Sequence, residues 1–287
     1  MSALLGRIAL YGRMIKFSHS VFALPFALAS AALAAGDGVS WRQVAWILVA
    51  MVGARSAAMG FNRLVDERLD ARNPRTAGRE LPRGAISRLE VWVLVAASAA
   101  TLVVASAMLN PLCLAFSPAA LLIIFCYSYT KRFTALSHVV LGFALAMAPV
   151  GAWLAIRGDF DLAAEALGLA VLFWVAGFDT IYACQDEAFD RGAGLHSLPA
   201  RIGIPRALLL ARVFHVIAVA MLAAVYVLAP LHPVYLAGLA AVAGLLVYEH
   251  SLVRADDLSR VDAAFFTVNG WISVGYFAIT LAARLMA

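Results

Sequence analysis

Two groups of carboxylate and amide side chains recur at helical spacing in an otherwise apolar sequence. The members of the first group are four residues apart, at Asn62, Asp66 and Asp70. Each step of four turns an α-helix by about 40° and rises by about 6 Å, so these side chains share one face. The second group has spacings of seven and four, at Asp179, Asp186 and Asp190. On one continuous helix these three also return to a common face, so we expect two ladders of oxygen ligands.

The chemistry that fits such ladders is the binding of Mg²⁺. Oxygen donors without accompanying His or Cys suit this ion, which is usually completed by phosphate oxygens of a substrate. The alternative for either ladder alone is a set of solvated ion pairs with nearby arginines, which contribute little. For Glu67, Glu80 and Glu187, which fall off the carboxylate faces, ion pairing is the better interpretation. Two ladders in separate parts of an apolar chain favour a site for two Mg²⁺ ions and a diphosphate.

The elements that must position these groups are membrane-spanning helices. Of the 287 residues, 64% are hydrophobic and 14% are charged, and the mean hydropathy is +0.89. These values exclude a disordered chain and a soluble enzyme with a single anchor. Because a span needs about 20 apolar residues, we predict an all-α polytopic membrane protein with one transmembrane domain over residues 1–287. Its nine expected spans lie near 15–35, 43–62, 89–109, 112–130, 137–156, 162–184, 207–230, 233–252 and 263–283.

Arginine and lysine are unevenly distributed among the connections. The segment 63–88 holds seven arginines, and further cations lie in 131–132, 191–206 and 254–260, whereas 36–40 holds none. The positive-inside rule therefore places the N-terminus and the acidic ladders at the cytoplasmic face, and we expect a multi-pass protein of the plasma (inner) membrane. The formal charge of +5 forms no continuous stripe, so nucleic acid is not an expected partner.

Further motifs accompany the two ladders. They are Asn73-Pro74-Arg75-Thr76, Arg79-Glu80-Leu81-Pro82-x-Gly84, Tyr127-x-x-x-Lys131-Arg132 and Asp179-x-x-Tyr182-x-x-Gln185-Asp186-x-x-x-Asp190. Together with Asn62-x-x-x-Asp66-x-x-x-Asp70 they resemble the UbiA family of intramembrane prenyltransferases, in particular its 4-hydroxybenzoate polyprenyltransferase branch. The resemblance covers about residues 15 to 275. It implies nine transmembrane helices around a central cavity open to lipid, Mg²⁺ as cofactor and a polyprenyl diphosphate donor.

The resemblance also implies roles for individual residues. The expected Mg²⁺ ligands are Asn62, Asp66, Asp70, Asp186 and Asp190, with Asp66 and Asp190 the most important for catalysis. Asp179 is expected to be a further ligand or a group on the acceptor side. One departure is His196-Ser197, because many members carry Lys before this serine. A diphosphate contact is therefore not carried over to His196.

Charged and aromatic side chains provide the remaining candidates. Lys131 and Arg72 are expected to bind diphosphate, since charge-assisted donors strengthen as negative charge grows. For Arg72 the alternative is an ordinary surface-loop residue. Tyr182 is expected to stabilise an allylic cation with its ring face, and the alternative is an aromatic residue of the interfacial belt. Arg132 and Lys16 are the candidates for an acceptor carboxylate, against the alternative of positive-inside anchoring.

These expectations define the function. The chain is predicted to transfer a polyprenyl group from polyprenyl diphosphate to an aromatic acid, 4-hydroxybenzoate, in quinone biosynthesis. One alternative acceptor is a dihydroxynaphthoate of menaquinone synthesis. A membrane transporter is the alternative from another class, because buried carboxylates also mark ion pathways. The clustering of the carboxylates at one membrane surface, with no relay across the middle, argues against it.

Overall fold

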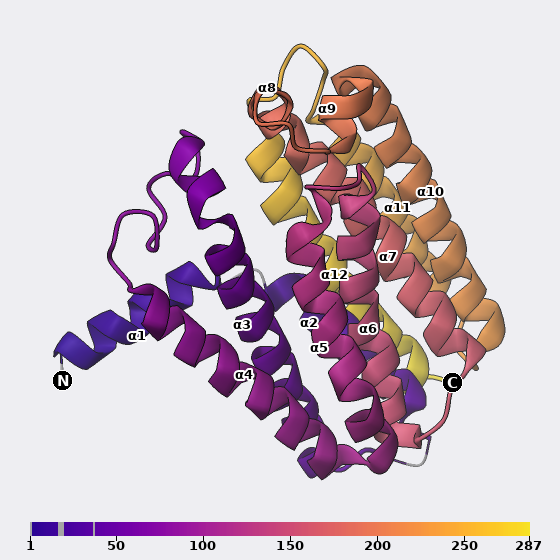
Figure 1. The fold of residues 1–287 in the computed structure, drawn as a ribbon. Helices are drawn as coiled ribbons and strands as arrows, with labels where there is room; N and C mark the ends of the chain where they lie inside the picture. The colour runs from indigo at the N-terminus through magenta and orange to yellow at the C-terminus, as the bar shows by residue number, and fades with distance from the viewer. Residues whose placement is uncertain (1, 17–19, 37) are drawn as a thin grey trace. The chain divides into compact units, whose positions relative to one another are not determined.

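The computed structural model describes residues 2–16, 20–36 and 38–287, and every regular element in these ranges is helical (Figure 1). The first half contains α1 (Ser2–Met14), α2 (Ser20–Ala34), α3 (Trp41–Arg72), α4 (Arg88–Leu109), α5 (Pro111–Thr130) and α6 (Ser137–Arg157). The second half contains α7 (Leu162–Ala183), the 3₁₀ turn η2 (Cys184–Asp186), α8 (Glu187–Gly192), α9 (Leu198–Ile202), α10 (Ile204–Leu228), α11 (Val234–Ser251), the π-helical turn η3 (Ala263–Val268) and α12 (Asn269–Leu285).

The length and composition of these helices confirm a protein with several membrane spans. Within the described ranges, 8 helical segments are long and apolar enough to cross a membrane. The first predicted span corresponds to a shorter apolar helix, Phe22–Ala34. Side chains such as Leu122, Val216 and Val247 are large, apolar and exposed, as expected for helices that face lipid rather than water.

The chain forms two compact units. Unit 1 comprises Met1–Ser20 and Ala45–Tyr129, and unit 2 comprises Val21–Val44 and Thr130–Ala287. In unit 1 the end of α1 packs with α3 and α4. The connection between α3 and α4 contributes Leu81 and Ile86 to this core, both nearly fully buried. This connection is therefore anchored by its own apolar side chains.

Unit 2 is organised around α7, which is buried along most of its length and packs mainly against α6 and α10. Small residues allow these helices to approach closely. A Cβ at Gly142 of α6 would lie 2.2 Å from the carbonyl oxygen of Leu172, and one at Gly177 of α7 would lie 2.2 Å from the His215 ring. Glycine at such contacts brings backbones together where apolar burial alone provides no driving force between helices in lipid.

The helical register changes at two places in unit 2. The expectation of one regular α-helix through Asp179, Asp186 and Asp190 holds only in part, because the helical segment Leu162–Gly192 contains the 3₁₀ turn η2 between α7 and α8. A 3₁₀ turn has about 3.0 residues per turn rather than 3.6, so it rotates the later carboxylates away from their expected direction. The second change is the π-helical turn η3, which precedes α12.

Candidate active site

The ladder of unit 1 lies on α3, as predicted. The side-chain amide Nδ2 of Asn62 donates to Oδ2 of Asp66 at 2.9 Å, so these residues share one helix face. Both side chains are half-buried. The α-helix continues to Arg72, about ten residues beyond the predicted end of the span, because charged residues that leave the apolar layer can still extend a helix.

Asp70, the last member of this ladder, is buried and neutralised by arginines. Nη1 of Arg79 lies 2.6 Å and 2.7 Å from its two carboxylate oxygens, and Nη1 of Arg63 lies 3.6 Å from Oδ2. The Thr76 hydroxyl donates to the Asp70 backbone carbonyl at 3.0 Å. The motif that follows α3 therefore folds back onto the helix end and surrounds Asp70 with cations.

The two cationic candidates of unit 1 differ in their surroundings. Lys16 adopts a left-handed conformation with φ of 48°, and its carbonyl accepts a hydrogen bond of 2.9 Å from Arg55. Arg72 is exposed at the end of α3. The structure thus brings Asn62 and Asp66 into contact, and it places Arg72 at the exposed end of the same helix.

The ladder of unit 2 ends in two buried carboxylates. Asp186 is 7% exposed and Asp190 is 3% exposed. The Oδ2 atom of Asp190 has no hydrogen-bond partner among the residues that the structure describes. A buried anionic oxygen without a partner is costly and calls for a ligand that the protein alone does not provide.

The three glutamates expected to form ion pairs all do so. Glu67 pairs with Arg88 and Glu187 pairs with Arg191, while Glu80 lies 4.0 Å from Arg13. Each lies next to or near a candidate ligand in the sequence but has its own cationic partner. These pairs provide matched control positions for the carboxylates of the two ladders.

Asp179 is held by a histidine that sequence reasoning missed. Nδ1 of the fully buried His138 lies 2.7 Å from Oδ2 of Asp179. The other ring nitrogen, Nε2, accepts from the backbone N–H of Leu198 at 3.4 Å. The available signal was the position of Ser137-His138 at the start of a predicted span, because a polar residue there must find a partner.

Tyr182 belongs to an aromatic group in unit 2. Its ring centroid lies 4.2 Å from that of Phe265 and 6.1 Å from that of Phe266, and both phenylalanines belong to η3. Nδ2 of Asn269 donates to the carbonyls of Ala264 and Phe265 at 3.1 Å and 3.2 Å. This side chain therefore satisfies carbonyls of the π-helical turn and fixes the position of Phe265.

Asn269 also connects α7, α11 and α12 through buried groups that the sequence did not reveal. Its Oδ1 accepts from Nε1 of Trp174 at 2.7 Å, and its Nδ2 lies 3.2 Å from Oε1 of the fully buried Glu249. The charged Glu249 near the end of a predicted span was the available signal.

In unit 2, the candidate cation Lys131 contacts the segment His196-Ser197, where the sequence departs from the family pattern. The carbonyl of Lys131 accepts from the backbone N–H of His196 at 2.7 Å. The neighbouring Ser197 is fully buried, and its hydroxyl caps α9 by accepting from Ala200 N. His196 is exposed, and Lys131 and Arg132 are half-buried. The backbone contact places Lys131 beside the residues that follow the second ladder.

The side chains of both ladders suit a hard cation. No three His, Cys, Asp or Glu side chains converge on one metal position among the described residues, and the two ladders belong to different units. Each ladder nevertheless contributes oxygen donors of the type that Mg²⁺ prefers. Among these donors, Oδ2 of Asp190 is the atom most clearly available to bind a cation, because it is buried and has no hydrogen-bond partner in the described ranges.

Comparisons with known proteins agree with the motifs. The sequence model of the UbiA prenyltransferase family matches residues 23–271. The 4-hydroxybenzoate octaprenyltransferase of Azoarcus sp. (strain BH72) is 30% identical over 277 residues, which are 95% of each chain. The protein of the same name from Cupriavidus necator is 31% identical over 290 residues, covering 98% of this chain and 99% of the relative.

Solved structures show the same fold. A UbiA homolog from Aeropyrum pernix K1, determined in its apo form, superimposes with a TM-score of 0.82 at 33% identity, over 93% of this chain and 97% of that one. A UbiA homolog from Archaeoglobus fulgidus bound to GPP and Mg²⁺ gives a TM-score of 0.73 at 23% identity, over 96% and 99% of the two chains. From its motifs, its helical fold and these similarities, the chain belongs to the UbiA prenyltransferase family.

Proposed function

We propose that this protein transfers a polyprenyl chain from polyprenyl diphosphate to 4-hydroxybenzoate in quinone biosynthesis. Family membership supports prenyl transfer, and the names of the relatives support this acceptor. The observation that carries the proposal is the buried, unpartnered Oδ2 of Asp190 at the end of the second ladder. In a UbiA-type chain this atom is best explained as a ligand of Mg²⁺.

The proposed Mg²⁺ ligands are the oxygen-bearing side chains of the two ladders. The ligands, direct or through water, are Asn62, Asp66, Asp70, Asp186 and Asp190. The hydrogen bond from Asn62 occupies Oδ2 of Asp66 and fixes the orientation of its carboxylate. The arginines around Asp70 make a water-mediated role the better assignment there. Bound Mg²⁺ would neutralise the charge that develops on the diphosphate leaving group. The A. fulgidus homolog bound to GPP and Mg²⁺ is the precedent for this pairing.

The residues around the ladders have separate tasks. Lys131 and Arg72 donate hydrogen bonds to diphosphate oxygens, and these bonds strengthen as the bond between the prenyl carbon and oxygen breaks. The resulting allylic cation is stabilised by the ring face of Tyr182, which Phe265 and Phe266 hold in place and shield from water. A carbon beside the acceptor hydroxyl then attacks the cation, and the proton on that ring carbon passes to the released diphosphate, which restores the aromatic ring.

The acceptor is oriented by charges at its two ends. Arg132, with Lys16 as the second candidate, pairs with the carboxylate of 4-hydroxybenzoate, because a guanidinium can hold a carboxylate through two parallel hydrogen bonds. Asp179 is the acceptor-side group of this proposal. Its carboxylate is held by His138 and accepts from the phenol hydroxyl, which increases electron density at the attacked carbon.

The proposed topology places this chemistry on the cytoplasmic side of the plasma (inner) membrane. The short helix α2 serves as the first of nine spans, the N-terminus is cytoplasmic, and residues 1–287 form one domain. The arginines of the segment 63–88 support this orientation through the positive-inside rule.

The test is a comparison of acceptors with purified protein, a polyprenyl diphosphate and Mg²⁺. We expect a prenylated product from 4-hydroxybenzoate and far less from phenol or a dihydroxynaphthoate. Arg132→Ala should raise KM for 4-hydroxybenzoate and remove most of its advantage over phenol, whereas Arg201→Ala, at an exposed position on α9, should change neither. A preference for the dihydroxynaphthoate would assign the protein to menaquinone synthesis, and indifference to the carboxylate would reject the role of Arg132.

A further inference from the structure

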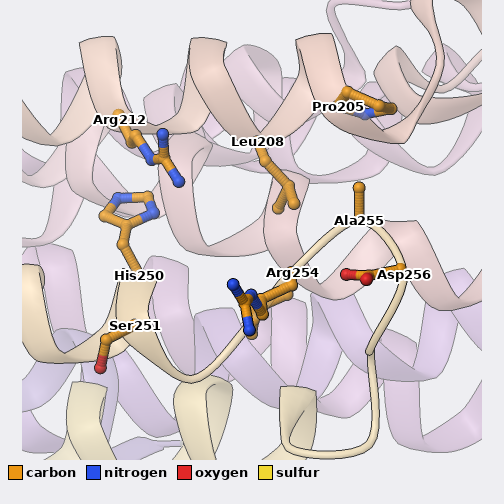
Figure 2. A pocket seen from close by; sticks show the side chains of 9 residues that line it. Pro205, Leu208, Arg212, His250, Ser251, Arg254, Ala255 and Asp256 are labelled. Carbon is orange, nitrogen blue, oxygen red and sulfur yellow. The ribbon is translucent and has the colours of Figure 1, made fainter.

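A cavity of about 550 Å³ opens in unit 2 between the first turns of α10 and the end of α11 (Figure 2). Leu208 and Arg212 line it from α10, His250 from α11, and Arg254 and Asp256 from the segment that follows α11. None of the residues assigned to prenyl transfer lines this cavity. Because α10 starts directly after α9, and α9 packs with α8, the cavity lies at the same end of unit 2 as Asp186 and Asp190.

The charges of this cavity favour an anion. Neither Arg212 nor Arg254 forms a side-chain ion pair with any residue in the described ranges, and both are exposed. Asp256 is the one carboxylate of the lining. The lining therefore holds two guanidinium groups and one carboxylate, with the Asp257 carboxylate near Arg254 but outside the lining. Guanidinium is the side chain best suited to bind a phosphate group through parallel hydrogen bonds.

The cationic side chains are carried by an anchored segment. Backbone hydrogen bonds join Arg254 N to Asp257 O at 3.0 Å and Asp257 N to Arg254 O at 3.2 Å, and the preceding Val253 is buried. Hydrogen bonds from Ser259, together with the charges of Arg254 and Arg260, hold the pKa of the Asp257 carboxyl below its ordinary value. The turn therefore presents Arg254 in a fixed place before any ligand arrives, which lowers the entropic cost of binding.

His250 is fixed in a similar way. Nε2 of His250 lies 2.9 Å from Nδ1 of the buried His215, and Nε2 of His215 lies 3.2 Å from the carbonyl of Trp174. Because that carbonyl accepts, His215 donates through Nε2, and its Nδ1 accepts from His250. Nδ1 of His250 is then the remaining acceptor of the ring and suits a hydroxyl group of a ligand.

The surroundings of the cavity identify the kind of anion. Next to the lining residues, α10 exposes Leu209 and Val213, and α11 exposes Val247 and Tyr248. Both helices have the length and composition of membrane spans, so these apolar side chains lie where acyl chains run. A basic pocket between spanning helices, bordered by a lipid-facing apolar surface, is typical of a site for an acidic lipid headgroup.

We propose that this cavity binds an anionic phospholipid whose phosphodiester pairs with Arg212 and Arg254. A hydroxyl of the headgroup, as in phosphatidylglycerol, donates to His250, and the acyl chains lie along Leu209, Val213 and Val247. Bound lipid joins the start of α10 to the end of α11. No carboxylate of the acidic ladders lines this cavity, and the proposal does not depend on the identity of the acceptor.

Native mass spectrometry of the full-length protein in detergent tests this proposal, with phosphatidylglycerol as the probe and phosphatidylcholine as the zwitterionic reference. We expect phosphatidylglycerol to bind wild-type protein more tightly. The double substitution Arg212→Gln with Arg254→Gln should weaken phosphatidylglycerol binding at least about tenfold, because it removes both charged donors to the phosphodiester. The matched control, Arg206→Gln with Arg260→Gln, removes the same charge from α10 and the same connecting segment but not from the cavity.

Two further variants sharpen the test. Asp256→Asn removes the opposing carboxylate and should tighten phosphatidylglycerol binding, an outcome that damage to the fold would not produce. Arg212→Lys with Arg254→Lys keeps the charge and should retain part of the affinity. Equal weakening in the cavity and control variants, or equal affinity for the two lipids, would overturn the proposal. Stabilisation by inorganic phosphate that requires Arg212 and Arg254, without selective lipid binding, would replace the lipid with a soluble phosphate compound.

Discussion

Nδ1 of His138 donates to Oδ2 of Asp179 across 2.7 Å, and Nε2 of the same ring accepts from the backbone N–H of Leu198. The Leu198 N–H can only donate, so Nε2 is the acceptor and Nδ1 carries the proton. Both nitrogens of a fully buried imidazole are thus used. This arrangement fixes the Asp179 carboxylate relative to the residues that follow the second ladder.

We predict that His138→Ala destabilises the protein and lowers its activity. The half-buried Asp179 carboxylate and the buried Leu198 N–H would lose their partner, which costs about 1–3 kcal/mol for a buried unsatisfied group and less for a partly exposed one. Thermal unfolding in detergent and kcat/KM for 4-hydroxybenzoate measure the two effects. His196→Ala is the control, because His196 is exposed, and it should shift stability by less than about 0.5 kcal/mol. Equal Tm values for the two variants would contradict the importance of this pair.

Two carboxylates of the first ladder should respond differently to substitution. Asp70 is surrounded by Arg79 and the buried Arg63, so Asp70→Asn leaves buried positive charge without its partner and should cost about 3 kcal/mol of stability. Asp66→Asn removes a ligand beside Asn62 and should abolish turnover with little change in Tm. Unfolding curves and activity, measured together on both variants, separate a stabilising role from a metal-binding role. A fully active Asp66→Asn protein would contradict the assignment.

The close approach of α6 and α7 gives a packing prediction. A methyl group at Gly142 would collide with the carbonyl of Leu172, whereas one at Gly151, on the same helix, would meet no atom within 4 Å. Gly142→Ala should therefore destabilise the protein by about 1–3 kcal/mol. Gly151→Ala should leave stability unchanged or raise it by up to about 1 kcal/mol, because alanine favours the helix. Similar Tm changes for both variants would show that the helices are not in close contact at Gly142.

The orientation of the protein in the membrane can be tested by labelling single cysteines. In a variant without the three native cysteines, Gly78→Cys and Ser40→Cys introduce single thiols at exposed positions of two different connections. We expect an impermeant maleimide added to intact cells to label Ser40→Cys, and to label Gly78→Cys only after the membrane is opened. The reverse pattern would place the arginine-rich connection outside and the proposed topology would be wrong.

The extent of the helices was largely predictable from the sequence. The predicted spans at 89–109, 112–130 and 137–156 agree closely with α4, α5 and α6. The turn-forming residues Asn110-Pro111 and Gly158 lie at the ends of these helices, so the boundaries could be read from the sequence. The end of α3 was not predictable from hydropathy, since a helix can continue through charged residues after it leaves the apolar layer. The choice of candidate ligands came from residue type and spacing, which need no tertiary information.

The partners of the candidate residues were not predictable in the same way. Arg79 on Asp70, His138 on Asp179 and Asn269 on Glu249 join residues that are 9, 41 and 20 positions apart, and their contacts depend on how the chain folds. The 3₁₀ turn before Asp190 also escaped prediction, because an ideal helix was assumed throughout. The spacing of the residues identified oxygen ligands for a metal ion, while tertiary packing decides which of these oxygen atoms remain available to bind it.

The most direct test of a Mg²⁺ site at the second ladder is diphosphate release as a function of Mg²⁺ concentration. Purified wild-type protein, Asp190→Asn and Glu187→Gln would be assayed with a polyprenyl diphosphate and 4-hydroxybenzoate, after removal of divalent ions and stepwise addition of Mg²⁺. Both substitutions neutralise a carboxylate of α8, but Glu187 is paired with Arg191 whereas Oδ2 of Asp190 has no described partner. We predict Mg²⁺-dependent release by wild-type protein and Glu187→Gln, and almost none by Asp190→Asn at any Mg²⁺ concentration. Release that is independent of Mg²⁺, or a Mg²⁺ response of Asp190→Asn equal to that of wild-type protein, would contradict the site.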